Sequence, residues 1–168
     1  MQRMATKRQV FYSFHFDNDV MRVQQIRNMG IVEGDTPASP NEWEQLKKKD
    51  GGQKKWIDDN MAYRSTVIVL IGQQTYKRPW VLYEIKKASA EKKALFGIYV
   101  HNLTCPNNGK CSQGLNPFDY ATISDGTNAG KALSTIIKCY NPPAADAYGS
   151  IQKNLDAWIE AATLAPKR

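Results

Sequence analysis

Residues 65–72 read STVIVLIG, a nearly unbroken run of apolar and mostly β-branched side chains. Such a run is typical of a central strand in a parallel sheet, because that strand is covered on both faces and need not alternate with polar residues. Parallel strands also require helices that return the chain to the starting edge. The run therefore predicts an α/β fold, a parallel sheet with helices on both faces.

The sequence after this strand predicts a helix that carries an acid in an unusual place. Residues 78–88 read RPWVLYEIKKA, in which Pro79 suits the first helical turn. At 100° per residue, Val81, Ile85 and Ala88 share one face, which we expect to be buried. Glu84 falls at the edge of that face, next in projection to Trp80.

The remaining sequence alternates strands with helices in the same way. Gly30 and the Asp50-Gly51-Gly52 triplet are expected to end helices, while residues 125–142 carry no clear pattern. The expected strands are 8–16, a short one at 31–32, 94–103 and 120–124. The expected helices run from a cap at Asp17 or Asn18 to Met29, from a capping box at Ser39-Pro40-Asn41-Glu42, over 54–64, and from Ala144 onward.

Length and composition indicate a single domain over residues 1–168. The chain has 168 residues, 42% of them apolar, enough for one full core. It contains no apolar run long enough to span a membrane, and MQRMATKRQV at the start has no signal-peptide pattern, so a cytoplasmic location without membrane association is expected. Cys105, Cys111 and Cys139 are too few and unevenly placed for a disulfide framework, which favours reduced thiols.

The net charge of +7 is spread along the chain rather than gathered in one basic segment. Its lysine clusters, at 47–49, 54–55, 86–87 and 92–93, favour solvated helix faces, and nucleic acid is not an expected partner. The alternative is that they attract an anionic nucleotide or partner.

In open parallel sheets, ligands bind beyond the carboxyl ends of the strands, at the point where the strand order reverses. Two strand ends are candidates for this position, Ser13-Phe14-His15-Phe16 and the segment from Ile71 to Thr75. If the two strands are neighbours, these segments meet at one rim. Glu84, about one turn into the next helix, can then face the crevice.

Several of these segments together resemble a known family. They are FYSFHFDNDVMRVQQIRN at 11–28, VIVLIGQQTYKRPWVLYEI at 67–85, and GIYVHNL at 97–103 followed by GLNP at 114–117. The pairing of the first two is similar to the TIR-like sensor proteins, of the ThsB type, of bacterial Thoeris antiphage systems; the W-x-x-x-E of Trp80 and Glu84 alone would be a weak match. The resemblance covers a core of about residues 8–125 and leaves a helical extension, 126–168, without an assigned role.

The resemblance implies a flavodoxin-like TIR domain that cleaves NAD and releases a cyclised ADP-ribose as an alarm signal, with Glu84 as the catalytic residue. It also implies a phage-derived trigger, self-association, and an effector protein reached through the diffusible nucleotide. Loss of nicotinamide builds oxocarbenium character on the ribose, which a fixed carboxylate stabilises. The alternative for Glu84 is a solvated acid paired with Lys86 or Lys87.

The other candidate substrate-binding residues each have a structural alternative. Trp80 is either a pocket wall or a core aromatic, and His15 either a pocket residue or a satisfied rim histidine. Gly72 permits close approach to a ligand but equally serves a tight turn. Arg27 and Asn28 could contact phosphate or only cap and solvate their helix. The full candidate set is Ser13, Phe14, His15, Phe16, Arg27, Asn28, Gly72, Thr75 and Trp80.

No retained cofactor or metal is expected. His101, Cys105 and Cys111 form H-x3-C-x5-C, which matches no standard zinc spacing, and the chain has neither a G-x-G-x-x-G fingerprint nor a P-loop. The NAD that the resemblance implies is expected as a substrate held by the rim loops and not as a retained cofactor. A TIR-like interaction module without turnover is the alternative function, and a nucleotide or deoxyribosyl transferase is less favoured because no second acid is placed with Glu84.

Overall fold

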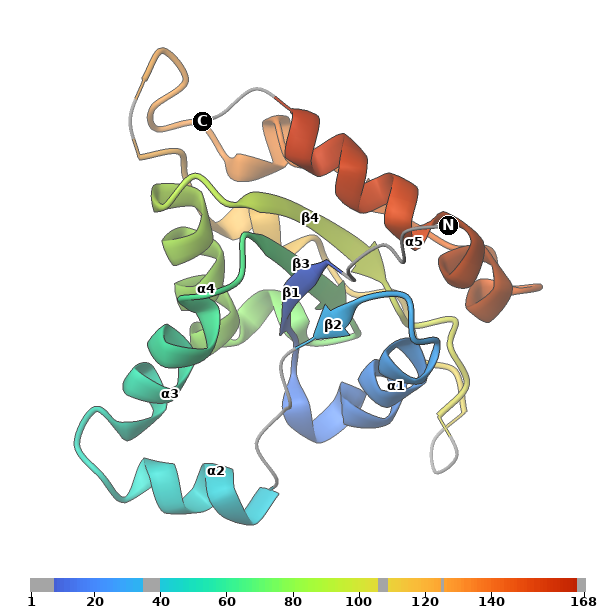
Figure 1. The fold of residues 1–168 in the computed structure, drawn as a ribbon, viewed down its shortest axis with the longest axis horizontal. Coiled ribbons are helices and arrows are strands. Elements are labelled where there is room, and N and C mark those ends of the chain that lie inside the picture. The colour runs from blue at the N-terminus through green and yellow to red at the C-terminus, as the bar shows by residue number, and fades with distance from the viewer. Residues whose placement is uncertain (1–7, 35–39, 106–108, 125, 166–168) are drawn as a thin grey trace, which may run out of the picture.

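The computed structural model describes residues 8–34, 40–105, 109–124 and 126–165, and within them a five-stranded parallel sheet in the order β2-β1-β3-β4-β5 (Figure 1). The strands are β1 (Gln9–Ser13), β2 (Glu33–Gly34), β3 (Thr66–Ile71), β4 (Ala94–Tyr99) and β5 (Cys139–Tyr140). The helices are α1 (Phe16–Asn28), α2 (Pro40–Lys47), α3 (Gly52–Met61), α4 (Pro79–Ala90) and α5 (Ala147–Leu164), with 3-10 turns η1 (Thr75–Lys77), η2 (Pro117–Tyr120) and η3 (Leu133–Thr135).

Strand β3 occupies the centre of the sheet, as its sequence predicts. All six of its residues are buried, and it pairs with β1 through Val10 and Thr66 and with β4 through Thr66 and Ala94. The α/β prediction is therefore confirmed. The order 2-1-3-4-5 is that of flavodoxin-like sheets, whose strand order reverses between β1 and β3.

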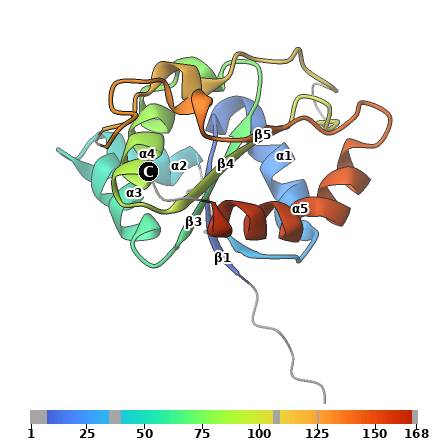
Figure 2. The same cartoon turned by 90° about the horizontal axis from the view of Figure 1, so that it is seen from above.

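The helices cover the sheet in two layers. Helices α1 and α5 lie on one face and α3 and α4 on the other (Figure 2). Alternate residues of each strand serve the two layers, so that Tyr12 packs with Ile151 of α5 whereas Phe11 packs with Ile85 of α4. No helix in the described residues is both long and apolar enough to cross a membrane.

Several expected boundaries are wrong. Helix α1 begins at Phe16 with His15 at its N-cap, because the amide of Asp19 already donates to the His15 carbonyl at 2.9 Å; the expected cap at Asp17 or Asn18 comes too late. The short strand lies at Glu33–Gly34 rather than 31–32, since Glu33 is the residue that pairs with Gln9. Helix α2 does begin at Pro40, whereas Ser39 lies outside the described residues.

The region after β4 departs most from expectation. No strand forms over 120–124: residues 117–120 make the turn η2, and Thr122 forms only an isolated bridge with Ala132. Residues 139–140, within the unassigned region, form the edge strand β5 beside Gly97 and Ile98.

The C-terminal residues complete both the sheet and its core. Strand β5 adds an edge to β4, and the Tyr140 ring stacks on Trp158 of α5 at 4.4 Å between centroids. Ile151, Leu155 and Ile159 of α5 are fully buried, whereas Tyr148 is exposed. Arg8, just before β1, forms ion pairs with Asp156 and Glu160. Residues 126–165 therefore contribute directly to the packing of the sheet.

Candidate active site

Helix α4, which packs against the sheet, carries Glu84. It begins at Pro79 and contacts β1, β3 and β4, with Val81, Ile85 and Ala88 facing the core as the sequence predicts. Glu84 is buried with them and keeps 6% of its surface exposed. Glu84 is therefore not a solvated surface acid, and the ion pairs of Lys87 go to Asp58 and Glu91.

Ser13 lies at the carboxyl end of β1, on the face of the sheet that α4 covers. Phe11 packs into the α3/α4 layer and Tyr12 into the opposite layer, so the alternation returns Ser13 to the side of α4. Ser13 is fully buried, and its Oγ has no hydrogen-bond partner among the described residues. A buried hydroxyl without a partner is costly, and a catalytic role is one recognised explanation for keeping it.

Phe14, His15 and Phe16 form the connection between β1 and α1 at the same rim. The rings of Phe14 and Phe16 stack at 6.1 Å between centroids, and Phe14 also packs partly against the α1/α5 layer. His15 holds the N-cap of α1 through its backbone. All three side chains are half-buried. Ser13 and Phe14 thus face opposite sides of the sheet.

Gly72 and Thr75 shape the neighbouring strand end. The amide of Gly72 donates to Oγ1 of buried Thr75 at 2.8 Å, which fixes the turn after β3. A Cβ atom on Gly72 would lie 2.0 Å from Oδ2 of Asp19. Glycine is thus required here by a neighbouring carboxylate of the protein itself, a reason that the sequence did not suggest.

Trp80 links the start of α4 to the start of α3. Its Nε1 donates to Oε1 of Gln53 at 3.0 Å. Its ring packs edge-on against the Tyr83 ring, with 5.6 Å between the ring centroids. The side chain is partly buried and packs against the α3/α4 core. Trp80 therefore lies at the rim with one edge in the core, so that both of its expected roles are compatible with its position.

Arg27 and Asn28 are not brought to this rim. They end α1, about 17–18 Å along the helix axis from Phe16 at a rise of 1.5 Å per residue. Arg27 donates to Gln24 at 3.3 Å, and Asn28 is exposed. Because α1 runs back across the sheet from the carboxyl edge, its last turn lies toward the other edge.

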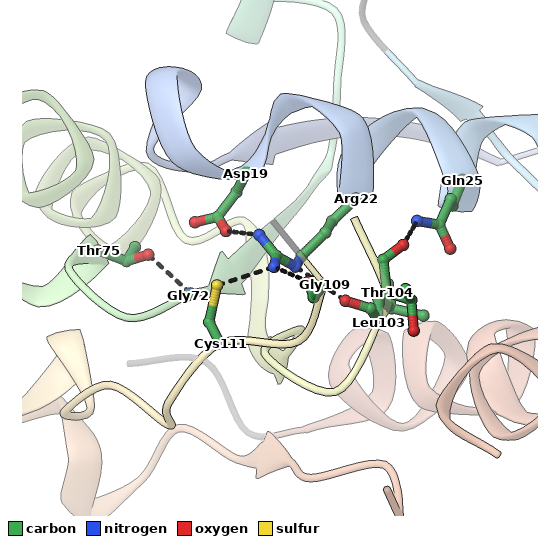
Figure 3. A network of polar contacts seen from close by, with 9 residues as sticks. All are labelled: Asp19, Arg22, Gln25, Gly72, Thr75, Leu103, Thr104, Gly109 and Cys111. Carbon is green, nitrogen blue, oxygen red and sulfur yellow. Dashed lines mark hydrogen bonds and ion pairs between the residues drawn. The ribbon is translucent and has the colours of Figure 1, made fainter. Parts of the chain in front are cut away.

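The structure adds a buried ion pair that sequence reasoning missed (Figure 3). Asp19 and Arg22 of α1 are both fully buried, and Nη1 of Arg22 donates to Oδ1 of Asp19 at 3.0 Å. The rest of the guanidinium is occupied by the loop after β4: the carbonyl of Leu103 at 3.0 Å, the carbonyl of Gly109 at 2.8 Å and Sγ of Cys111 at 2.8 Å. Arg22 therefore ties α1 to this loop.

A signal for this pair is present in the sequence. Asp19, Arg22, Val23 and Ile26 follow the i, i+3, i+4, i+7 spacing of a buried helix face. Two opposite charges on such a face predict a buried pair, because an isolated charge there would be too costly.

The loop after β4 closes over the end of β3. A Cβ atom on Gly114 would lie 2.1 Å from the carbonyl oxygen of Gly72, so the two backbones are in contact. His101, at the start of the loop, is buried; burial, and secondly the positive charge of Arg22, lower the pKa of His101 below its ordinary value. A neutral imidazole beside Arg22 is the expected state at pH 7.

The cysteines are free thiols, and burial raises the pKa of Cys139 to about 12, which makes it a poor nucleophile. Among the residues that the structure describes, no group of three or more His, Cys, Asp and Glu side chains could hold a metal ion. Besides Asp19, which is paired with Arg22, the rim therefore offers the buried carboxylate of Glu84, the buried hydroxyl of Ser13 and aromatic rings. This set suits stabilisation of a developing positive charge.

Comparison with known proteins identifies the family. Residues 11–105 match the family described as "Thoeris protein ThsB, TIR-like domain". The chain belongs to this family. The resemblance drawn from the sequence and the flavodoxin-like TIR fold are thereby confirmed.

One curated relative in the ThsB family also matches. It is "Putative cyclic ADP-D-ribose synthase ThsB1" of Bacillus cereus (strain MSX-D12), to which the chain is 34% identical over 119 residues. The match covers 67% of this chain and 62% of that protein. The chain therefore spans less than two thirds of the relative's length.

Proposed function

We propose that the protein cleaves the bond between nicotinamide and ribose in NAD and closes the remaining ADP-ribose into a cyclic product, which serves as a signal in antiphage defence. Membership of the ThsB family and the name of the matched relative support this reaction. The observation that carries the proposal is the burial of Glu84 near the strand-order reversal between β1 and β3.

The reaction places specific demands on the site. When the glycosidic bond breaks, its electron pair leaves with nicotinamide, and the ribose C1′ becomes an oxocarbenium centre. A carboxylate fixed at low exposure stabilises this charge more strongly than one in water, because the surrounding dielectric is lower. Nicotinamide leaves neutral and needs no proton. Attack on C1′ by a nucleophile of the same molecule gives the cyclic product, whereas attack by water gives ADP-ribose.

The decisive experiment compares two Glu→Gln changes, one within α4 and one at its C-cap, Glu91. Glu84→Gln keeps the size of the side chain and removes its charge, so nicotinamide release should fall by about 100-fold or more while the protein stays folded. Glu91→Gln, at the exposed end of the helix where Glu91 pairs with Lys87 at 3.2 Å, is the matched control and should retain activity. Unchanged turnover in Glu84→Gln would reject the catalytic role of Glu84, whereas the absence of turnover in the parent protein, with and without lysate from infected cells, would favour a non-catalytic TIR-like interaction module.

We also propose that the enzyme works in the cytoplasm and stays nearly inactive until a phage-derived trigger promotes self-association. The product then reaches a separate effector protein by diffusion. An enzyme that drained NAD without restraint would harm its own cell, which motivates a gated site. The test is nicotinamide release over a range of protein concentrations, with and without lysate from infected cells. Rapid turnover by dilute, unstimulated protein would show a constitutive enzyme instead.

A further inference from the structure

A hollow of about 540 Å³ lies between the turn that joins α2 to α3 and the first turn of α4. Residues 46–54 and Trp80 line it. Helix α3 leads into β3 and α4 follows β3, so both helices begin at the carboxyl edge of the sheet. The hydrogen bond from Trp80 to Gln53 joins the two helix starts. The hollow therefore opens one helical turn from Glu84, at the same rim.

The charge of this hollow is strongly positive. Its lining carries Lys47, Lys48, Lys49 and Lys54 against a single acid, Asp50. Lys47 pairs with Glu44 at 2.8 Å and Lys54 with Asp58 at 2.9 Å. Lys48 and Lys49 are exposed and form no ion pair with any residue that the structure describes. Two ammonium groups beside a concave surface are therefore available to an anion.

The backbone adds donors to the same hollow. Gly51 occupies the N-cap of α3 at φ 68°, so the helix begins without a side-chain cap. The amides of Gln53 and Lys54 in its first turn have no acceptor within the helix and lie at the positive end of its dipole. Nε2 of Gln53 is buried and has no hydrogen-bond partner in the described part of the chain.

The turn that carries the lysines is tightly folded. A Cβ atom on Gly52 would lie 2.5 Å from the carbonyl oxygen of Leu46, at the end of α2. The amide of Gly52 also donates to the carbonyl of Lys49 at 3.1 Å. These contacts fix the backbone of Lys48 and Lys49 relative to α3, which lowers the entropy lost when a ligand binds.

We propose that this hollow binds the diphosphate of the dinucleotide substrate, an inference that rests on the proposed function of Glu84. A diphosphate is compact and doubly charged, and it accepts hydrogen bonds from lysine ammonium groups and from amides at a helix N-terminus. Trp80 lines the hollow and lies about one helical turn before Glu84 on α4. The arrangement selects substrates that carry a diphosphate over the corresponding nucleoside.

The test measures binding, so that it does not depend on turnover. ADP-ribose, inorganic pyrophosphate and nicotinamide riboside are titrated by calorimetry into the Glu84→Gln protein and into the same protein carrying Lys48→Ala and Lys49→Ala. We expect the lysine substitutions to weaken the binding of ADP-ribose and of pyrophosphate by about tenfold or more, because two charge-assisted contacts are lost. Binding of nicotinamide riboside, which has no phosphate, should not change.

A control with the same charge change carries Lys86→Ala and Lys153→Ala, two exposed lysines outside the hollow. It should bind ADP-ribose within about twofold of the parent, whereas Asp50→Asn should bind it more tightly, because a nearby negative charge is removed. Three results would overturn the proposal. The first is an equal loss of ADP-ribose affinity in the Lys48/Lys49 and Lys86/Lys153 variants, and the second is an unchanged affinity in the Lys48/Lys49 variant. The third is that the parent protein does not bind ADP-ribose. If the Lys48/Lys49 variant loses ADP-ribose binding while Glu84→Gln still cleaves NAD fully, the anion site is supported and the catalytic role of Glu84 is rejected.

Discussion

Helices α1 and α4 both begin at the rim of the sheet, yet polar groups of different exposure anchor them. Arg22 anchors α1 to the loop after β4 through a guanidinium that is fully buried. Helix α4 is joined to α3 by Tyr83, whose hydroxyl donates to Asp58 at 2.5 Å, and by Lys87, 3.7 Å from the same carboxylate. Asp58 keeps 29% of its side chain exposed.

The difference teaches that similar hydrogen bonds contribute unequally. Water competes for the groups around Asp58, so each contact there adds little to the free energy of unfolding. Arg22 and Asp19 are fully buried, so removing one charge leaves the other in the interior without its oppositely charged partner. We therefore expect the α1 anchor to dominate stability.

The largest effect is expected for Arg22→Ala. It leaves the buried carboxylate of Asp19 without its arginine and should lower the free energy of unfolding by about 3–5 kcal/mol, as measured by urea denaturation. A double variant, Asp19→Asn with Arg22→Met, removes both charges and should recover a large part of this loss. A cost below about 1 kcal/mol for Arg22→Ala would contradict the comparison.

A smaller effect is expected for Gly72→Ala. The added methyl group would meet Oδ2 of Asp19 at 2.0 Å, and the repacking should cost about 1–3 kcal/mol. The cost should shrink when Asp19→Ser shortens the opposing side chain, which a double-mutant cycle measures as a coupling energy. Additive effects of the two changes would show that the contact does not limit this position.

Asp58→Asn should cost less again, about 1 kcal/mol at pH 7. Burial alone would raise the pKa of Asp58, but the hydrogen bonds from Tyr83 and Lys54 outweigh it and hold the pKa below its ordinary value of 3.8. A lowered folded-state pKa means that the ionised form stabilises the fold above pH 3.8 and that this stability is lost as pH falls through the folded-state pKa.

Urea midpoints of the wild type and Asp58→Asn, measured from pH 7 to pH 2, check this dependence. The gap between them should be constant above pH 5 and close at the acidic end. A gap that widens as pH falls would show that the carboxylate does not stabilise the link between α3 and α4.

The smallest effect is expected for Lys55→Ala. Lys55 pairs with Asp59 at 2.7 Å on the outer surface of α3, where the two side chains are 77% and 61% exposed. Such pairs are screened by salt and offset by the ordering of two side chains. The urea midpoint should not move measurably. A shift as large as that of Asp58→Asn would contradict the expectation that a more exposed ion pair contributes less to stability.

The core of the fold and the position of Glu84 could be predicted from local sequence. The burial of β3, the start of α4 at Pro79 and the inward face of Val81 and Ile85 each follow from patterns within one short window. Strand ends were less predictable: β4 ends at Tyr99 although the apolar run continues, because Val100 and Leu103 pack into the core from the loop.

The candidate site was predictable only in part, for a related reason. Ser13, His15, Gly72 and Trp80 lie at the expected rim because a strand end fixes its neighbours, while Arg27 and Asn28 were placed there without allowance for the length of α1. The short strand β5 was not predicted because a strand of two residues is too short to show an alternating hydrophobic pattern.

The sequence by itself determined which segments are strands and helices, that the sheet is parallel, and that a carboxylate sits on the edge of a buried helix face. These properties depend on backbone preferences and hydrophobic periodicity over a few residues. Only the tertiary structure decided that Arg22 donates to Leu103, Gly109 and Cys111, which lie 81, 87 and 89 positions further along the chain. It also decided that Asp19 forces a glycine at 72, and that the turn carrying four lysines lies beside Trp80, with which it lines one hollow. Such contacts depend on which distant segments the packed core brings together, and no short window of sequence contains both partners.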